Sequence, residues 1–184
     1  EGKLDSYLVS RPDVRYSTPK WIIDLLNKEY GKEKTRLILE DQYKDHDTVI
    51  RFNALRIDKE SLRDIMQEKG VTVKDGVLTD TSLRISDYDM VQRLPGFKEG
   101  LFFIQDETST YMVEHIGIRP GDRILDLCAS PGGKSILAYI LSSNDEVKGN
   151  VISRDISEYK LGLIEENIER LKISYHIELQ IDLS

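Results

Sequence analysis

The chain of 184 residues is 39% hydrophobic and 32% charged, and its net charge is −7. This length allows one domain or two small ones, each with a buried core. The mean hydropathy is −0.41, and no apolar run approaches the roughly 20 residues that span a bilayer, which excludes a membrane protein.

The only cysteine, Cys128, cannot form an internal disulfide. One cysteine and three histidines scattered along the chain do not have the spacing of a metal site, so none is expected. No signal-peptide pattern opens the chain, so a reduced, cytoplasmic protein is expected. The first 100 residues contain 18 basic and 19 acidic residues, and the remaining 84 contain 8 basic and 14 acidic ones. This acidic balance argues against strong non-specific binding to nucleic acid. The chain runs from Glu1 to Ser184 and ends directly after a strand-like stretch, as expected of a piece of a longer protein.

Short helices and strands alternate in the first 100 residues. Thr18 followed by Pro19 is typical of a helix start and Gly31 of its end, while Asp75-Gly76 is typical of a hairpin turn. The expected elements are helices over residues 19–30, 34–43 and 58–70 and strands over 48–57, 71–73, 77–78 and 83–85. This β-α-β-β order predicts a small α+β domain, ferredoxin-like or RRM-like.

A different pattern follows residue 100. The expected elements are strands over residues 101–104, 123–127, 150–153 and 177–181 and helices over 106–116, 134–141 and 158–171. The β-α-β-α-β order from residue 123 onward predicts the first half of a doubly wound parallel sheet. Two domains are therefore expected, an α+β domain with N-terminal helices over residues 1–100 and half of an α/β domain over residues 101–184.

A glycine-rich turn, Asp-Leu-Cys-Ala-Ser-Pro-Gly-Gly-Lys-Ser at residues 126–135, lies between a predicted strand and a predicted helix. Glycine lets the backbone approach a ligand at which the helix N-terminus points. A P-loop would need glycine in place of Cys128, five residues before Gly133, and the dinucleotide fingerprint is absent. A third interpretation is a site for S-adenosylmethionine (SAM), in which such a turn holds the amino-acid and ribose part of the cofactor.

Three aspartates support the third interpretation through their spacing. Asp126, Asp155 and Asp182 follow successive strands and are 29 and 27 residues apart, about one βα unit each. In a parallel sheet they would all lie at the carboxyl edge, where ligands bind. The carboxylate of Asp155 could accept two hydrogen bonds from a ribose diol, and Asp182 could accept one from the adenine amino group. The competing explanation for any one of them is that aspartate is common where strands end.

The turn at residues 126–134, preceded by Gln-Asp-Glu-Thr-Ser at 105–109, closely resembles the Sun/Fmu-type RNA cytosine-5 methyltransferases, which include bacterial enzymes acting on 16S ribosomal RNA. Their first motif is D-x-C-A-A-P-G-G-K, preceded by Q-D-x-S-S. Ser130 replaces the second alanine of the first motif, and Glu107-Thr108 lies inside the Q-D segment. Weaker upstream resemblances are Pro19-Lys-Trp21, Tyr30-Gly31 and Arg51-Phe-Asn53.

The resemblance implies a Rossmann-like SAM-dependent domain preceded by an α+β domain that contributes to binding ribosomal RNA. The cofactor-binding residues that it implies are Cys128, Ala129, Ser130, Pro131, Gly132, Gly133, Lys134, Asp155 and Asp182. In this family the cysteine of the turn belongs to the cofactor motif and is not the nucleophile.

The chemistry of the family requires a cysteine thiolate that adds to C6 of cytosine, so that C5 can attack the methyl group of SAM. A second cysteine assists release. Both belong to D-A-P-C and P-C motifs that do not occur here, so no catalytic residue is expected and the chain alone should be inactive. A truncated sheet would also expose apolar surface and an unpaired strand, and self-association is expected.

Two alternatives stay open. The chain could be a non-catalytic RNA-binding or ribosome-assembly module that retains the fold, or a nucleotide-binding protein that only mimics the turn. Among other residues, Trp21 is expected in a core rather than stacked on a base. Arg51, Arg56 and Arg63 could follow a phosphate backbone or be ordinary surface residues.

Overall fold

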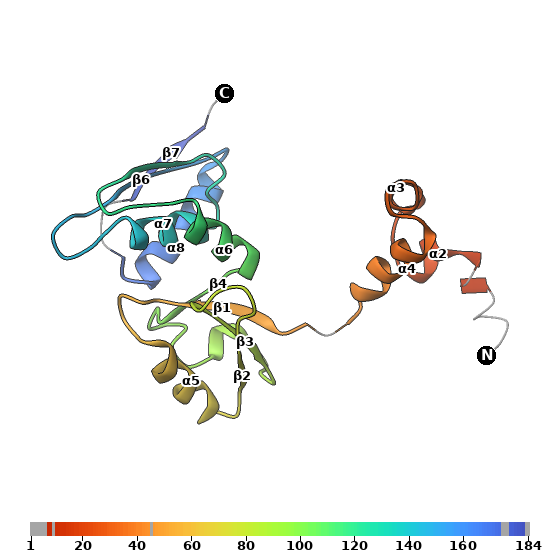
Figure 1. Cartoon of the computed structure of the whole chain (residues 1–184), viewed down its shortest axis with the longest axis horizontal. Coiled ribbons are helices and arrows are strands. Elements are labelled where there is room, and N and C mark those ends of the chain that lie inside the picture. Colours follow the sequence, from red (N-terminus) through yellow and green to blue (C-terminus); the bar gives the residue numbers. More distant parts are fainter. Residues whose placement is uncertain (1–6, 9, 45, 174–176, 183–184) are drawn as a thin grey trace. The chain divides into compact units, whose positions relative to one another are not determined.

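The computed structural model describes residues 7–8, 10–44, 46–173 and 177–182. The chain divides into two compact units, residues 1–46 and 47–184 (Figure 1). Within the described ranges, no helix is long and apolar enough to cross a membrane. The same residues contain no group of three or more histidine, cysteine or acidic side chains that could hold a metal ion.

The first unit is helical. Its described helices are α2 (Pro12–Arg15), α3 (Lys20–Tyr30) and α4 (Lys32–Asp41). Gly31 separates α3 from α4 with a φ of +77°, a backbone conformation that glycine adopts without a steric penalty, which confirms the predicted helix end. Tyr16, Ile23 and Leu39 form the core of this unit. The expectation for Trp21 is wrong, because its side chain is 68% exposed and the buried face of α3 is centred on Ile23.

The second unit begins with an antiparallel sheet. Its strands, in the order β2-β3-β1-β4, are β1 (Thr48–Phe52), β2 (Thr72–Asp75), β3 (Ser82–Ser86) and β4 (Phe102–Ile104). Helix α5 (Lys59–Gln67) joins β1 to β2 and begins as predicted at Asp58, whose Oδ1 accepts a hydrogen bond from the Ser61 N–H at 2.9 Å. A single 3-10 turn, η1 (Val91–Arg93), lies between β3 and β4. This architecture confirms the ferredoxin-like expectation.

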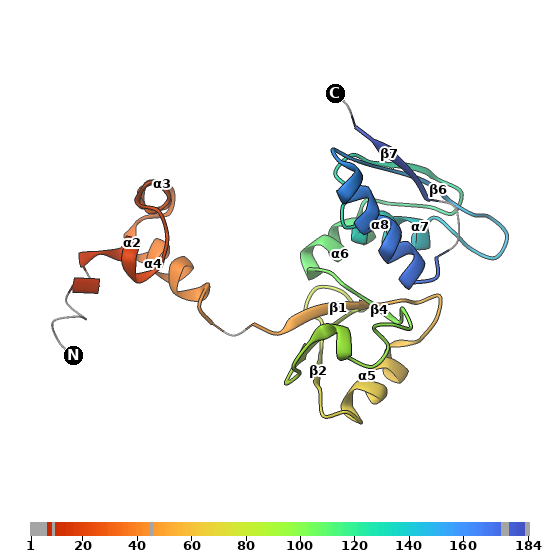
Figure 2. The same ribbon diagram turned by 180° about the vertical axis from the view of Figure 1, so that it is seen from behind.

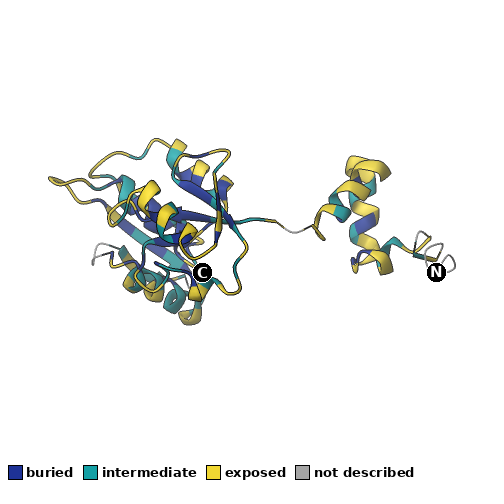
Figure 3. Ribbon diagram, turned by 90° about the horizontal axis from the view of Figure 1, so that it is seen from below, coloured by how far each residue is buried: buried dark blue, intermediate teal, exposed yellow. Residues whose placement is uncertain are grey.

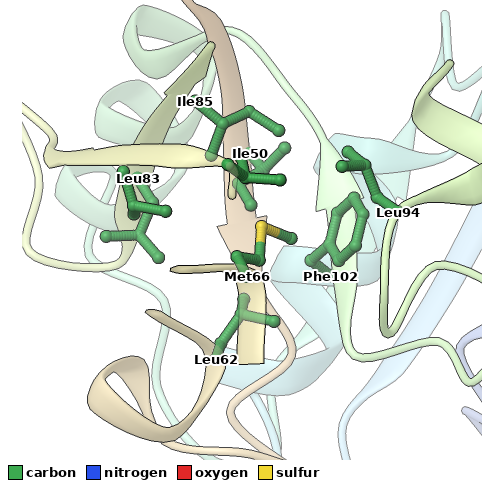
Figure 4. Close-up of a cluster of buried hydrophobic side chains, with 9 residues drawn as sticks. Ile50, Leu62, Met66, Leu83, Ile85, Leu94 and Phe102 are labelled. Atoms are coloured by element: carbon green, nitrogen blue, oxygen red, sulfur yellow. The ribbon is translucent and has the colours of Figure 1, made fainter. Parts of the chain in front are cut away.

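One face of this first sheet packs against α5 to form a continuous apolar core (Figure 4). Ile50 and Phe102 come from the strands and Leu62 and Met66 from α5, and all four side chains are fully buried. Each such burial contributes roughly 1.5–3 kcal/mol. The spacing of Leu62 and Met66, one helical turn apart, is the sequence pattern that predicted this face.

The loop between β2 and β3 is wider than the predicted hairpin. Val77 and Leu78, predicted as a strand, lie in the loop and are 72% and 48% exposed. The carboxylate of Glu107 holds the loop from a distance, since its Oε1 accepts hydrogen bonds from the N–H groups of Leu78 and Thr79 at 2.6 and 3.1 Å. A local turn signal could not reveal this contact between segments 28 residues apart.

Strand β4 belongs to the first sheet. Its residues pair antiparallel with β1, with Phe103 opposite Arg51. The division into two domains itself stays a prediction. The boundary predicted after residue 100 assigns β4 to the C-terminal domain, whereas the structure pairs β4 with β1 in the first sheet. The reason is that β4 completes the backbone hydrogen bonding of β1, which short-range sequence patterns do not report.

The second sheet is parallel, with strand order β5-β6-β7. Its elements are β5 (Arg123–Asp126), α7 (Gly133–Leu141), β6 (Asn150–Asp155), α8 (Glu158–Arg170) and β7 (Ile177–Ile181). Helix α6 (Glu107–His115), capped by Asp106, precedes β5. Figures 1 and 2 show α6, α7 and α8 lying between the two sheets, and Figure 3 shows buried residues concentrated inside this unit. The predicted half of a Rossmann-like sheet is confirmed.

Candidate cofactor site

The three predicted aspartates meet at one edge of the second sheet. Asp126 ends β5, Asp155 ends β6, and Asp182 directly follows β7. The backbone N–H of Asp182 donates to the carbonyl of Asp155 at 2.9 Å, so these two residues are immediate neighbours. The spacing of one βα unit between them therefore led to the correct placement at the carboxyl ends of the strands.

Asp126, the first residue of the glycine-rich turn at residues 126–135, bonds to both ends of the segment that follows it. Its Oδ2 accepts a hydrogen bond from the Ser135 hydroxyl at 2.7 Å, and its Oδ1 accepts one from the Cys128 N–H at 3.2 Å. The first carboxylate of the edge thus has a structural role in closing the turn. Cys128 itself is exposed.

Asp155 holds the middle of the turn. Its Oδ2 accepts a hydrogen bond from the Ser130 N–H at 2.9 Å and its Oδ1 one from the Ile156 N–H at 2.8 Å. The Lys160 ammonium lies 3.0 Å from Oδ1. The Ser130 N–H is the main reason why the pKa of Asp155 lies below its usual value; burial opposes this, and Ile156 and Lys160 add to the lowering. The side chain is therefore an ionised acceptor that is only 5% exposed.

Backbone contacts fix the remainder of the turn against β6 and α8. The buried Ala129 donates its N–H to the Arg154 carbonyl at 3.0 Å. The carbonyl of Pro131 accepts a hydrogen bond from Asn167 Nδ2 on α8 at 3.1 Å. The turn is consequently held on both sides, while the rings and side chains of Pro131 and Cys128 remain exposed.

The two glycines of the turn face the protein interior. Gly132 has a φ of +101°, and a Cβ there would lie 3.1 Å from Cγ2 of Ile164 on α8. A Cβ on Gly133 would lie 2.8 Å from Cε1 of Phe103 and 3.3 Å from the Gln105 amide. Sequence reasoning attributed these glycines to the approach of a ligand, whereas the structure shows that backbone conformation and packing already require them.

A cavity of about 290 Å³ opens beside the turn, at the free edge of β5. Lys134, in the first turn of α7, contributes to its wall, together with Asp126 and Ser135. The remaining wall is apolar and consists of Met112, Val113, Ile116, Ile124, Leu125, Leu127 and Ala138.

Several residues around the turn were missed by sequence reasoning or misjudged. Three residues that contact the turn or its aspartates were missed, namely Ser135, Lys160 and Asn167. Ser135 lies in the first turn of α7, Lys160 in the first turn of α8, and Asn167 further along α8. These positions on the helices that follow β5 and β6 were the signal that could have identified them. Arg51 is neither a surface residue nor exposed to RNA phosphates, since it is 2% exposed and donates to Gln105.

Two family models match the chain. The model for the ferredoxin-like domain of RsmF/B-like methyltransferases matches residues 18–92, and the model for 16S rRNA methyltransferase RsmB/F matches residues 114–184. Curated relatives carry the name ribosomal RNA small subunit methyltransferase B. The protein from Serratia proteamaculans is 29% identical over 91% of this chain and 38% of its own length, and the one from Vibrio cholerae 28% identical over 95% and 39%. The chain thus spans less than two fifths of these relatives.

Solved structures share the fold. A methyltransferase homolog protein from Pyrococcus horikoshii is 24% identical with a TM-score of 0.74, covering 94% of this chain and 54% of that one. The structure of NSun6 from Pyrococcus horikoshii with SFG is 17% identical with a TM-score of 0.77, covering 90% and 65%. The two family models together match most of the chain, and the chain belongs to the RsmB/F family of methyltransferases.

Proposed function

We propose that the chain is the cofactor-binding part of a SAM-dependent methyltransferase that modifies cytosine C5 in small-subunit ribosomal RNA. One observation carries the proposal: the glycine-rich turn, the carboxylate of Asp155 and the backbone of Asp182 lie together at the carboxyl edge of a parallel sheet. Family membership and the names of the curated relatives support the methyltransferase activity and the RNA substrate. The NSun6 structure, which was solved with SFG, supports the cofactor.

The residues present fit this cofactor chemically. An ionised carboxylate offers about four acceptor positions, and three of those of Asp155 are used by Ser130, Ile156 and Lys160. The Lys160 side chain is 43% exposed, so it can move away and leave two acceptors for a ribose diol. Asp182 would lie beside the adenine and the turn 128–134 beside the amino-acid part. The cofactor supplies the methyl group.

Transfer to cytosine C5 requires a thiolate that adds to C6 of the base. Cys128 is the only cysteine in the sequence, and its backbone N–H is bonded to Asp126 inside the turn assigned to the cofactor. The attacking cysteine would therefore come from outside these 184 residues. We expect the chain alone to incorporate no methyl group into 16S ribosomal RNA, and incorporation that Cys128→Ala abolishes would contradict this assignment.

Calorimetric titration of the chain with S-adenosylhomocysteine (SAH), the demethylated product, tests the cofactor assignment. Asp155→Ala should weaken binding about 5- to 150-fold, because charge-assisted hydrogen bonds of about 1–3 kcal/mol are lost. Asp64→Ala is the matched control, since Asp64 is an exposed aspartate on α5, in a separate element from the turn. Equal affinity for SAH in wild type and Asp155→Ala, or tighter binding of ATP than of SAH, would refute the assignment.

A further inference from the structure

Arg51 is a buried cation without a carboxylate partner. Its side chain is 2% exposed, and within the part of the chain that the structure describes no acidic side chain forms an ion pair with it. Burial lowers the pKa of the guanidinium to about 10, and the negative charge of Glu114 offsets this only in part. Burying an unpaired charge costs stability, so an arginine here indicates a role that an apolar residue could not fill.

The hydrogen bonds of Arg51 lead from the first sheet to the glycine-rich turn. Its Nε donates to Gln105 Oε1 at 3.0 Å, and its Nη2 makes a longer contact of 3.5 Å with the carbonyl of Gly133. Gly133 is the first residue of α7. A single side chain thus connects β1 to the point where the turn becomes a helix.

The packing around this contact leaves the turn little freedom. Gly133 lies so close to β4 that a Cβ would be 2.8 Å from Phe103 and 3.3 Å from the Gln105 amide. Phe103 stands opposite Arg51 in the β1–β4 pairing and packs in the core of the second sheet. Gln105 is 7% exposed, and its Nε2 has no hydrogen-bond partner among the described residues. Its Oε1 is committed to Arg51, so the amide cannot turn over without breaking that bond.

The turn therefore has two supports of different origin. Asp126 and Asp155 hold residues 128 and 130 from within the second sheet. Arg51, itself bonded to Gln105, contacts the carbonyl of residue 133 from the first sheet. The support from Asp126 and Asp155 would exist in any domain that contains the parallel sheet alone. The support from Arg51 exists only because the ferredoxin-like domain is attached.

We propose that Arg51, together with Gln105, is a positioning residue that sets the geometry of the glycine-rich turn and thereby its affinity for the amino-acid part of SAM. This inference rests on the proposed function. If Arg51 positions the turn in this way, the ferredoxin-like domain takes part in cofactor binding. The contribution acts through the turn and requires no contact between Arg51 and the cofactor.

Two ligands separate positioning from general destabilisation. SAH carries the amino-acid part, and 5′-methylthioadenosine lacks it while keeping the ribose and adenine. In the folded chain, Arg51→Met should weaken SAH binding about tenfold and 5′-methylthioadenosine binding by less than about twofold. Arg51→Lys retains the charge but cannot contact Gln105 and Gly133 with one planar fork, so an intermediate loss of about threefold for SAH is expected.

Asn53 provides the matched control. It is equally buried, and its Nδ2 donates to the carbonyls of Gly100 and Leu171 at 3.0 Å each, which joins the first sheet to the end of α8 and not to the turn. Asn53→Ala should lower stability in urea unfolding and leave the ratio of the two affinities unchanged.

The outcomes of this experiment are distinct. If Arg51→Met does not fold, Arg51→Lys decides the question by the same ratio. An unchanged ratio in the folded arginine variants, or an equal change in Asn53→Ala, would overturn the positioning role while leaving the proposed function standing. A wild-type chain that binds neither ligand would overturn both.

Discussion

Replacing Asp155 by alanine should destabilise the folded chain as well as weaken cofactor binding. The change removes the acceptor of two backbone N–H groups, those of Ser130 and Ile156, at 2.9 and 2.8 Å. A hydrogen bond to a charged group contributes about 1.5–3 kcal/mol, so the two together contribute about 3 kcal/mol at the lower limit. The ion pair with Lys160, whose side chain is 43% exposed, adds no more than about 1 kcal/mol.

A loss of about 3 kcal/mol is a large fraction of the roughly 5–15 kcal/mol that stabilises a typical domain. For a chain of this size it corresponds to a fall in Tm of roughly 6–12 °C. Urea and thermal unfolding followed by circular dichroism would measure both quantities. Asp155→Asn retains one carbonyl acceptor and should lose about half as much, and the exposed Asp64→Ala should stay within about 0.5 kcal/mol of wild type. An Asp155→Ala variant as stable as Asp64→Ala would refute the view that this carboxylate holds the turn.

Three further predictions concern other parts of the second unit. Gly133→Ala should lower the free energy of unfolding by about 1–3 kcal/mol, because its Cβ would lie 2.8 Å from Phe103; unchanged stability would show that β4 can shift. Amide exchange should be slow over residues 49–52, which pair with a strand on each side, and faster over 124–127, where β5 pairs only with β6. The reverse order, in a chain that sediments as a monomer, would contradict the expected self-association through the edge of β5. The pKa of Asp155 is lower in the folded chain than in the unfolded one, so the ionised carboxylate contributes fully to stability at neutral pH, and this contribution is lost as the pH falls below about 4. Asp155→Asn should therefore lose less stability than wild type between about pH 5 and pH 3 in urea unfolding.

Much of the fold could be predicted because its signals are local. Gly31, Asp58 and Asp106 each mark a helix end within a few residues of where the structure has it. The order of strands and helices after residue 123 follows from alternating apolar segments of characteristic length. At the site, the spacing of Asp126, Asp155 and Asp182 sufficed because parallel βα units return each strand end to the same edge.

What the sequence did not reveal depends on partners far along the chain. Trp21 has the helical spacing of a core residue, but which face of α3 is buried depends on its packing with α2 and α4. Arg51 is typical of a surface strand until β4 and α7 cover it. The glycines of the turn looked available to a ligand because Ile164 and Phe103, which they face, lie about 30 residues away in either direction.

Strand β4 has a consequence for anyone who divides this protein for expression. Its neighbouring residues Phe102 and Phe103 point to opposite faces and enter two different hydrophobic cores, one in each sheet. A cut after residue 100, where the composition changes, would remove one aromatic ring from the first core and leave the edge of β1 bare. The two halves should fail to fold separately but recover when mixed, whereas a cut between residues 46 and 47 leaves both cores intact.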